Sequence, residues 1–498
     1  MQILEFRIWV NEEHMKTIVC GIDSSTQSCT IVARHPDTGE ILGFSRAPHS
    51  KTSPPRSEQS PTEWWSALQQ ALKEFNTSSI GAVSIDGQGH GLVLLDEAGI
   101  VLRRAKLWND TESMKESKEL IDRLGKSEWI RLTSIVPVPA FTITKLLWIR
   151  RNESDILKRS RKILLPHDWL VYKMSGRFVT DRSEASGTGY FSPAKSSWIV
   201  ELLNLVDPNI DWKPMLPAIA GPDEMVGVVS SIASEELGIP IGTPIGPGCN
   251  DNPASALGLG LKNSDVCISL GTSGTVFAPS ISPVFDESGY VNGNADATGA
   301  FLPLICTLNA AKVTDWVCKI LDLNHDEAAY LALSAPAKPD RPIVIPFFDG
   351  ERSPNLPRAT GSIIGLKTDT SREQLLRACY EGVLLGIASG LDALGNAGVD
   401  ISGRIILTGG GAASPAYVQL LADIINRPVW ISTETKSAAL GAAVQAAAVF
   451  HKCSVTEIRD QWAPELRLGA MPRANQSVAE IRQRYNDLVK QEEIRATS

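Results

Sequence analysis

The amino-acid sequence predicts an α/β fold made of two large domains that repeat one architecture. Its 498 residues are too many for one domain, at roughly 150 residues per domain. Short apolar strands alternate with amphipathic helices, which is typical of layered α/β structure. A hairpin whose turn consists of glycine and hydroxyl residues occurs near the start and again after the middle. This repetition indicates an internal duplication.

The first domain opens with strands. Residues 17–22, 30–33 and 41–44 are apolar runs joined by short polar turns, so we expect an antiparallel meander. The sequence "SPTE" at 60–63 combines a helix N-cap, a proline at the first helical position and the glutamate of a capping box. A helix is therefore predicted to begin there, with its tryptophan and leucine side chains on the buried face.

Three strands and a helix of small residues complete this half of the chain. Residues 80–86 alternate like a strand, with 92–95 as the expected hairpin partner, and another short strand is predicted over 105–107. A turn leads into a helix of small residues within 246–258, which lets neighbouring elements approach closely. We place the domain boundary just after residue 258.

The second domain repeats the opening hairpin. A strand over 265–270, a turn over 271–274 and a returning strand over 275–278 match the hairpin at 21–33 in type. A long apolar helix is expected over 372–394. The remaining predicted elements are strands over 404–407 and 429–431, helices over 414–426 and 437–450, and a C-terminal helix that starts with a capping box at Ser477 and Glu480 and docks through Ile481, Tyr485 and Leu488.

Composition excludes several classes of protein. The chain has 48 Lys and Arg residues against 56 Asp and Glu residues and a net charge of −8, so no basic surface indicates a nucleic-acid partner or an anionic membrane. No stretch predicts a membrane span. The eight cysteines contain no CxxC pair and lie in apolar runs. They are expected to be core thiols in a reducing compartment, which predicts a cytoplasmic protein.

The first fourteen residues do not resemble a targeting signal. They lack a basic start, a continuous apolar centre and a small-residue cleavage site. Met15 stands directly before the first predicted strand, so residues 1–14 are expected to be an extension outside the fold.

Three turns rich in glycine, serine and threonine could hold phosphate groups. They cover residues 23–28, 271–275 and 408–412, where consecutive backbone amides can point into one concavity and bind an anion without lysine. Each turn alone is equally consistent with an ordinary hairpin. Together they favour nucleotide binding, and the P-loop, dinucleotide and HExxH patterns are absent from the sequence.

Two aspartates are candidates for the chemistry. Asp23 ends the first strand beside a phosphate turn, where it could hold Mg²⁺ through water or simply close an Asx turn. Asp251 could act as a base. It could equally precede a helix capped by Asn252 that begins at Pro253, because a carboxylate there is favoured by the helix dipole.

Two polar turns are candidates for ligand contacts. His90 lies between glycines after a strand, in "DGQGHG", which leaves its ring open to a small polar ligand, although a lone histidine is commonly structural. Trp108, Asn109 and Asp110 end another strand. Asp110 has a simpler explanation as the cap of the helix that follows.

The chain resembles the FGGY family of carbohydrate kinases, in the superfamily of sugar kinases, Hsp70 and actin. The resemblance runs from Lys16 to about Leu488 and keeps the order of the family's motifs. They include "GIDSSTQSCT", "EQSPTEWW", "DGQGHGLVLLD", "LWNDTES", "GPGCNDNPASALG", "SLGTSGTV", "FFDGERSP" and "LTGGGAASPAYVQLLADIINRPV".

This resemblance implies two ribonuclease-H-like domains of the actin/hexokinase type with an interdomain cleft. The domain over 15–258 would bind sugar and carry the first phosphate turn, and the domain over 259–498 would bind ATP. ATP and Mg²⁺ are the implied cofactors. Asp251 would be the general base and Asp23 would help position Mg²⁺. The resemblance assigns phosphate contacts to Ser24, Ser25, Thr26, Gly271, Thr272 and Ser273, adenosine contacts to Gly410, Gly411 and Ser414, and sugar contacts to Gly89, His90, Trp108, Asn109, Asp110 and Asp251.

Within the family, the elements around His90 and Trp108 are most similar to those of kinases that phosphorylate D-xylulose at O5 with ATP. The resemblance also allows a homodimer. Two positions depart from that pattern: Gly89 stands where methionine is usual, which would enlarge the sugar pocket, and Glu112 stands where arginine is usual, which changes a local ion pair. A kinase for ribulose, gluconate or glycerol is an alternative, although the Arg-Glu pair of glycerol kinases is absent. A non-catalytic sugar or nucleotide sensor is another.

Overall fold

The computed structural model describes residues 17–474 and 477–497, so the predicted extension over residues 1–14 lies outside the described residues. Contacts divide the chain into two compact units. Unit 1 contains the chain up to Gly260 together with 293–301 and 436–463, and unit 2 contains the rest. The chain first passes from unit 1 to unit 2 after Gly260, next to the boundary expected at residue 258. The segment 436–463 packs within unit 1, whereas the sequence prediction assigned it to the second domain.

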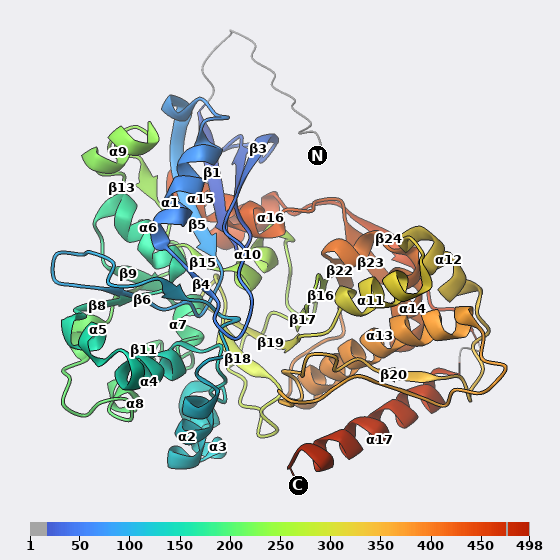
Figure 1. The fold of residues 1–498 in the computed structure, drawn as a ribbon. Coiled ribbons are helices and arrows are strands. Elements are labelled where there is room, and N and C mark those ends of the chain that lie inside the picture. The colour runs from blue at the N-terminus through green and yellow to red at the C-terminus, as the bar shows by residue number, and fades with distance from the viewer. Residues whose placement is uncertain (1–16, 475–476, 498) are drawn as a thin grey trace. The chain divides into compact units, whose positions relative to one another are not determined.

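Unit 1 is built on one mixed sheet (Figure 1) with the strand order β13-β14-β5-β1-β2-β3. Its strands are β1 (Ile18–Ser24), β2 (Ser28–Arg34), β3 (Ile41–Pro48), β5 (Ile80–Gly87), β13 (Gly227–Val228) and β14 (Pro244–Ile245). β1, β2 and β3 pair antiparallel, as the meander prediction requires. β5 pairs parallel to β1, and β14 pairs parallel to β5.

A helix covers each face of this sheet. Because side chains alternate along a strand, Ile22 of β1 joins Trp64 of α1 (Pro61–Leu72) in one core, whereas Val19 joins Ala443 of α15 (Ser437–His451) in another. α1 begins with the predicted proline and capping box. α15 comes from near the end of the chain yet lies against β1 at its start, as the red and blue ribbons of Figure 1 show.

Small residues bring α15 unusually close to its neighbours. A Cβ built on Gly441 of α15 would lie well inside 3.0 Å of the carbonyl oxygen of Ala254, which belongs to α10 (Asp251–Gly258). A Cβ on Gly21 of β1 would be equally close to the carbonyl oxygen of Ala439. Real Cβ atoms are not found at such distances, so these backbones can touch only because the residues are glycines.

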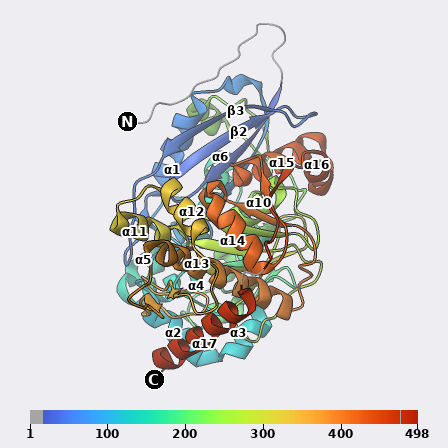
Figure 2. The same ribbon diagram turned by 90° about the vertical axis from the view of Figure 1, so that its right-hand side faces the viewer.

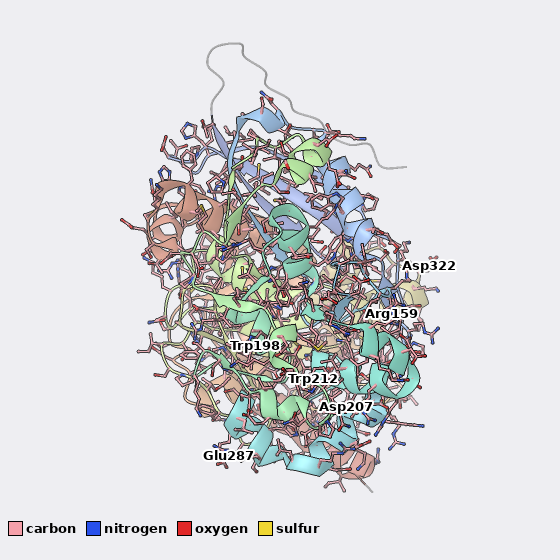
Figure 3. The ribbon with its side chains drawn as sticks, turned by 90° about the vertical axis from the view of Figure 1, so that its left-hand side faces the viewer. Arg159, Trp198, Asp207, Trp212, Glu287 and Asp322 are labelled. Carbon is pink, nitrogen blue, oxygen red and sulfur yellow. The ribbon has the colours of Figure 1, made fainter. Side chains whose placement is uncertain are left out.

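The rest of unit 1 consists of short strands and helices, of which some pack against the main sheet and others surround a further core. Its elements are β4 (Glu58–Gln59), β6 (Val93–Leu95), β7 (Ala105–Lys106), α2 (Met114–Leu124), α3 (Lys126–Thr133), α4 (Thr142–Asn152), α5 (Ser154–Arg159), β8 (Lys162–Leu164), α6 (Pro166–Ser175), β9 (Val179–Asp181), α7 (Arg182–Ser186), β10 (Phe191–Ser192), β11 (Ser197–Trp198), α8 (Val200–Leu203), β12 (Ala218–Ala220), α9 (Ser231–Leu237), β15 (Cys249–Asn250) and α16 (Val455–Gln461). In this part Trp198 and Trp212, labelled in Figure 3, donate their indole N–H groups to the carbonyl oxygens of Pro217 and Asp207.

One predicted pairing is wrong. The strand at 92–95 was expected to form a hairpin with 80–86, but β6 pairs antiparallel with β8. The reason is that both edges of β5 are already taken, by β1 on one side and by β14 and β15 on the other.

Unit 2 repeats the sheet of unit 1. Its strands run in the order β19-β17-β16-β22-β23-β24, where β16 (Val266–Leu270), β17 (Gly274–Phe277) and β19 (Phe301–Thr307) form the antiparallel meander, and β22 (Ile405–Thr408), β23 (Val429–Ser432) and β24 (Leu466–Ala470) follow. β22 is parallel to β16 and β23 is parallel to β22. The same directions hold for the corresponding strands of unit 1, which confirms the predicted duplication. β18 (Asn292–Ala295) lies where the chain passes from unit 2 to unit 1.

Helices pack on this second sheet, and one face of the C-terminal helix docks against its core. Figure 2 looks onto α12, α13 and α14, which contact one another. The elements are α11 (Ala311–Leu321), α12 (His325–Ser334), β20 (Ile343–Ile345), β21 (Ser362–Ile364), α13 (Arg372–Asn396), α14 (Pro415–Ile425) and α17 (Val478–Thr497). Ile481 and Tyr485 of α17 are buried in the core and Leu488 packs against it, as predicted.

Two sequence expectations about composition can be compared with the fold. All eight cysteines are free thiols. Six are buried, as predicted for core residues, whereas Cys306 and Cys453 are partly exposed. Among the described residues, no helix combines the length and the apolar character needed to cross a bilayer.

The close packing of α15 makes a testable prediction. Gly441→Ala should lower the apparent thermal midpoint by several degrees, because the added Cβ would force α15 away from α10 and overpacking of this kind costs about 1–3 kcal/mol. Differential scanning fluorimetry measures the shift. Gly43→Ala in β3 is the matched control, since its Cβ would make an ordinary contact at 3.6 Å with Phe75. Equal midpoints for the two variants would contradict the packing account.

Candidate active site

Three aspartates meet where parallel strands of unit 1 end. Asp23 of β1 stands opposite Asp86 of β5 in the parallel register, and β15 pairs with the same end of β5 through Cys249 and Asn250. Asp251 follows directly as the first residue of α10. Ligands of open α/β sheets bind outside the carboxyl ends of the strands, so this edge is the natural place for a site.

Asp86 is fully buried and Asp23 and Asp251 are partly buried, and all three carboxyl groups have a raised pKa. Burial, followed by the charge of Asp251, raises the pKa of Asp23 to about 7. Burial and the charges of Asp23 and Asp251 raise the pKa of Asp86 well above its ordinary value, and burial raises the pKa of Asp251 to about 6. Perturbation of this kind is typical of functional sites.

The oxygens of this cluster suit a hard cation. Apart from the contact between the two carboxyl groups, Asp23 Oδ1 and both carboxyl oxygens of Asp86 have no hydrogen-bond partner among the described residues. Buried carboxylates that lack partners are costly, and a divalent cation with a preference for oxygen ligands would relieve that cost. Asp23 therefore fits the predicted role of positioning Mg²⁺, and Asp86, which was not predicted, offers oxygens of the same kind beside it.

Asp251 lies at the start of its helix rather than before it. The predicted cap at Asn252 is wrong, because α10 begins two residues earlier and Asn250 is its N-cap, accepting a hydrogen bond from the Asn252 backbone N–H. The Asn252 side chain donates to Asp251 Oδ1 at 2.8 Å. Together with a hydrogen bond from the Asn252 backbone, this bond fixes the orientation of the Asp251 carboxylate.

The first glycine/hydroxyl turn is ordered by its own side chains. Ser25 donates from its backbone N–H and from its hydroxyl to the Ser28 carbonyl oxygen, which closes the turn. Thr26 Oγ1 donates to Gln88 Oε1 at 3.0 Å and accepts from Trp108 Nε1 at 2.9 Å. The fold thus brings the predicted phosphate residues Ser24, Ser25 and Thr26 beside the predicted sugar residue Trp108.

His90 sits in a pocket that glycine makes possible. Its backbone is left-handed, with φ of 65°, and its ring meets Phe141 edge-on at 5.0 Å. A Cβ on Gly187 would overlap the His90 ring. Lys145 Nζ donates to the His90 carbonyl oxygen at 2.8 Å and secures the turn.

Gly89 does not leave an empty space. A Cβ built there would overlap Asn250 Nδ2. Glycine at this position was expected to enlarge the pocket. That expectation is wrong, because the Asn250 carboxamide fills the space that a side chain at position 89 would occupy.

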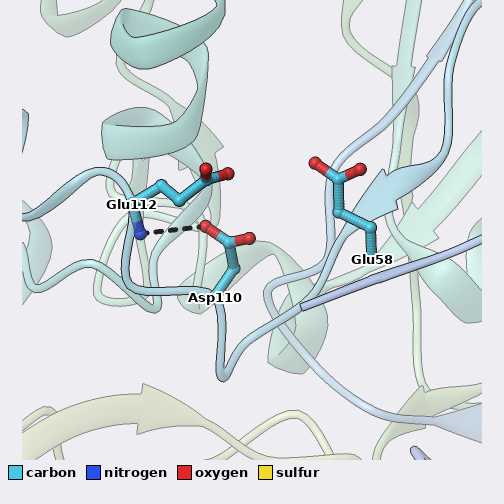
Figure 4. A group of neighbouring side chains, drawn as sticks. All are labelled: Glu58, Asp110 and Glu112. Carbon is cyan, nitrogen blue, oxygen red and sulfur yellow. Dashed lines mark hydrogen bonds between the residues drawn. The ribbon is translucent and has the colours of Figure 1, made fainter. Parts of the chain in front are cut away.

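Asp110 belongs to a buried charge cluster rather than to a helix cap. The N-cap of α2 is Ser113, and the Asp110 carboxylate accepts from Ser57 N at 2.9 Å and from Lys106 Nζ at 3.2 Å. Figure 4 shows Asp110 with Glu58 and Glu112. The fully buried Lys106 ammonium pairs with all three carboxylates and lies 3.9 Å from the Trp148 ring centroid.

This cluster explains the departure at position 112. Glu112 forms ion pairs with Lys106 and with Arg56. The position therefore still takes part in a local ion pair, with the acidic group on residue 112. The cluster anchors the loop that carries Trp108 and Asn109. Asn109 Oδ1 is buried and has no hydrogen-bond partner among the described residues.

Unit 2 carries a second group of predicted contacts at the matching sheet edge. β16 and β22 are parallel neighbours, so the turn at Gly271, Thr272 and Ser273 lies next to the segment after β22. A Cβ on Gly411 would overlap Leu270, the residue before this turn, whereas Gly410 faces open space. Ser414 is the N-cap residue of α14.

Sequence reasoning missed several residues of unit 1. Asp86 could have been found, because a carboxylate ending a strand parallel to β1 must lie beside Asp23. Glu184 and Ser183 carry no signal of their own. They contact Asn250 only because α7 packs against β15.

The comparisons with known proteins agree with this geometry. A model of the FGGY family of carbohydrate kinases, N-terminal domain, matches residues 18–258, and the model of its C-terminal domain matches 266–450. The xylulose kinase of Streptomyces rubiginosus is 38% identical over 451 residues, covering 89% of this chain and 90% of the relative. The xylulose kinase of Haemophilus influenzae is 34% identical, covering 86% and 89%.

A solved structure gives the same answer for the fold. The crystal structure of xylulose kinase from Bifidobacterium adolescentis superposes with a TM-score of 0.84 at 32% sequence identity, covering 95% of this chain and 100% of that chain. Both units therefore have counterparts in that protein.

The carboxylate cluster predicts a dependence of stability on pH. Because the pKa of Asp23 is raised to about 7, the folded state holds a proton that the unfolded state releases near pH 4, and stability falls as pH rises from about 4 through about 7. Asp23→Asn removes this effect. The variant should gain on the order of 1–4 kcal/mol over wild type at pH 8 without Mg²⁺, and much less at pH 5.

Thermal unfolding in EDTA at the two pH values measures the difference. Asp369→Asn, a change at an exposed aspartate, serves as the matched control and should track wild type at both. A stability difference between Asp23→Asn and wild type that is the same at pH 5 and pH 8 would show that Asp23 does not carry the raised pKa.

Proposed function

The chain belongs to the FGGY family of carbohydrate kinases, and from this premise we propose that it transfers the γ-phosphoryl group of ATP to O5 of D-xylulose, giving D-xylulose 5-phosphate and ADP. The single observation that carries the proposal is the buried edge where Asp23, Asp86 and Asp251 meet. The relatives named xylulose kinase, which align over nearly the whole chain, support the choice of sugar.

Asp251 is the proposed general base. The primary hydroxyl of the sugar attacks the γ-phosphorus in line and gives its proton to the Asp251 carboxylate. Phosphoryl transfer passes through a loose transition state, so orientation of the hydroxyl contributes more than basicity. A pKa of about 6 leaves Asp251 mostly ionised at neutral pH, and its bond from Asn252 keeps it aimed.

Asp23 and Asp86 are proposed to hold Mg²⁺. The ion would neutralise charge on the β- and γ-phosphates of ATP when bound. Among the residues of the chain, the amides and hydroxyls of Ser24, Ser25 and Thr26 would bind phosphate oxygens from unit 1. The proposed contacts from unit 2 are Gly271, Thr272 and Ser273 to phosphate and Gly410, Gly411 and Ser414 to adenosine.

The sugar contacts are proposed for two turns, one that carries Gly89 and His90 beside Asn250 and one that carries Trp108 beside Thr26. His90 and Asn109 would hydrogen-bond the hydroxyl groups, and Trp108 would pack against the carbon chain while its indole N–H stays on Thr26. Asp110 holds the loop through Lys106, so we propose that it acts by positioning Trp108 and Asn109. The eight free thiols suit a reducing compartment, and we infer a cytoplasmic enzyme.

The proposed role of Asp251 as general base can be tested by removing its carboxylate. Asp251→Asn should lower kcat by about 10²-fold or more, because the hydroxyl loses its proton acceptor, while the thermal midpoint does not fall. A coupled assay for ADP release measures the rate, and circular dichroism checks the fold. Near-wild-type turnover in this variant would remove Asp251 from the reaction. Asp369→Asn, remote in sequence from every proposed contact and exposed, should keep wild-type turnover.

The proposed substrate can be tested by comparing sugars. With Mg²⁺ and ATP, kcat/KM should be highest for D-xylulose among D-xylulose, D-ribulose, gluconate and glycerol, and NMR should place the phosphate on O5. Preferential phosphorylation of a polyol or a sugar acid would overturn the substrate assignment. ADP release that needs no sugar would overturn the assignment as a sugar kinase.

A further inference from the structure

We infer that the carboxamide of Asn250 is a specificity-determining group of the sugar site and that it occupies the space of a side chain at position 89. The inference rests on the proposed function, because the site in question is the one formed by Gly89, His90 and Asp251. It concerns which groups line that site and therefore which sugar fits.

The two positions interlock. A Cβ built on Gly89 would overlap Asn250 Nδ2 and would lie 3.2 Å from Asn250 Cγ and 3.4 Å from Glu184 Oε2. No residue larger than glycine therefore fits at position 89 while Asn250 keeps its conformation. The carboxamide takes the volume that a larger side chain beside His90 would fill.

Three bonds hold the Asn250 residue in place. Its Nδ2 donates to Glu184 Oε2 at 2.9 Å, its Oδ1 accepts from the Asn252 backbone N–H at 3.3 Å, and its own backbone N–H donates to Ser183 Oγ at 3.1 Å. Glu184 and Ser183 are themselves held by the cap of α7, since Asp181 accepts from both of their backbone N–H groups. The orientation of the amide is thus fixed before any sugar binds.

A fixed amide in this place offers a polar contact. Nδ2 carries two hydrogens, and its single hydrogen bond within the described part of the chain is the one to Glu184. Nδ2 faces Gly89, the residue before His90, where a Cβ would overlap it. The geometry points to a hydrogen bond from the second N–H of Nδ2 to a hydroxyl oxygen of the ketose, where a larger residue at position 89 would present an apolar surface.

A double-mutant cycle tests the interlock. In the wild-type background, Gly89→Ala should raise KM for D-xylulose at least tenfold, because the new Cβ displaces the amide, and should leave KM for ATP within twofold. Asn250→Ala should raise KM for D-xylulose about tenfold through loss of the donor. In the Asn250→Ala background, Gly89→Ala should cost nothing further, because the clash is gone.

Asn250→Ser separates sugar recognition from helix capping. Serine caps a helix as well as asparagine does but lacks the amide, so this variant should keep the cap of α10 and still lose affinity for D-xylulose. Its thermal midpoint should lie above that of Asn250→Ala, because Asn250→Ala loses the cap as well as the hydrogen bond to the buried Glu184. It should also change the ratio of kcat/KM for D-xylulose to that for D-ribulose at least fivefold. Gly43→Ala serves again as a control with ordinary contacts.

Two results would overturn the inference. One is an equal effect of Gly89→Ala with and without Asn250, and the other is an Asn250→Ser enzyme with wild-type KM and sugar preference. Failure of the proposed function is distinguishable, because it would appear in the wild-type enzyme as preference for another sugar. The same cycle can then be measured on that sugar, where the interlock predicts the same loss of additivity.

Discussion

The structure of unit 1 depends on backbone contact between α15, β1 and α10. Gly21 of β1 and Gly441 of α15 have no side chains, so a strand and two helices approach until their backbones touch. That approach sets the distance between the end of β1, which carries Asp23, and the start of α10, which carries Asp251. Close packing of this kind also makes the geometry stiff, because interiors at this density do not deform gradually.

The cost of the arrangement is electrostatic. Three carboxyl groups, one fully and two partly buried, are brought together. Apart from the contact between Asp23 and Asp86, oxygens of these two residues have no hydrogen-bond partner among the described residues. Functional sites commonly store unfavourable energy that a ligand relieves. The net charge of −8 is consistent with this reading, because the proposed phosphate contacts are backbone amides, hydroxyls and a cation held by aspartates, and they do not require a basic surface.

Features with a local signal could be predicted from the sequence, and features set by long-range pairing could not. The capping box before α1, the two hairpins with glycine/hydroxyl turns and the docking face of α17 follow from residues close together in the chain, and the structure confirms them. The partner of β6 depended on which edges of β5 were already occupied, which no local pattern reports. The start of α10 was misplaced because the Asn-Pro pair is a good cap signal, yet Asn250 provides a cap two residues earlier.

The residues of the candidate site also separate into those with a local sequence signal and those that depend on long-range pairing. Asp23, His90 and Asp251 stand out in the sequence because each lies in or beside a turn that follows a strand or opens a helix. Asp86 needed the parallel register of β1 and β5, and the partnership of Gly89 with Asn250 needed the fold itself. The sequence alone indicates that glycine at position 89 leaves space in the pocket. In the structure, Asn250 from another segment fills that space.

The most direct test of the central claim is a single-turnover rapid-quench measurement of phosphoryl transfer from ATP to D-xylulose at increasing Mg²⁺. The account predicts that raising Mg²⁺ restores most of the transfer rate in Asp23→Asn, because that residue helps to hold the ion, and restores none of it in Asp251→Asn, because that residue accepts the proton. Wild-type transfer rates in both variants at low Mg²⁺ would contradict the claim that these carboxylates form the reactive centre.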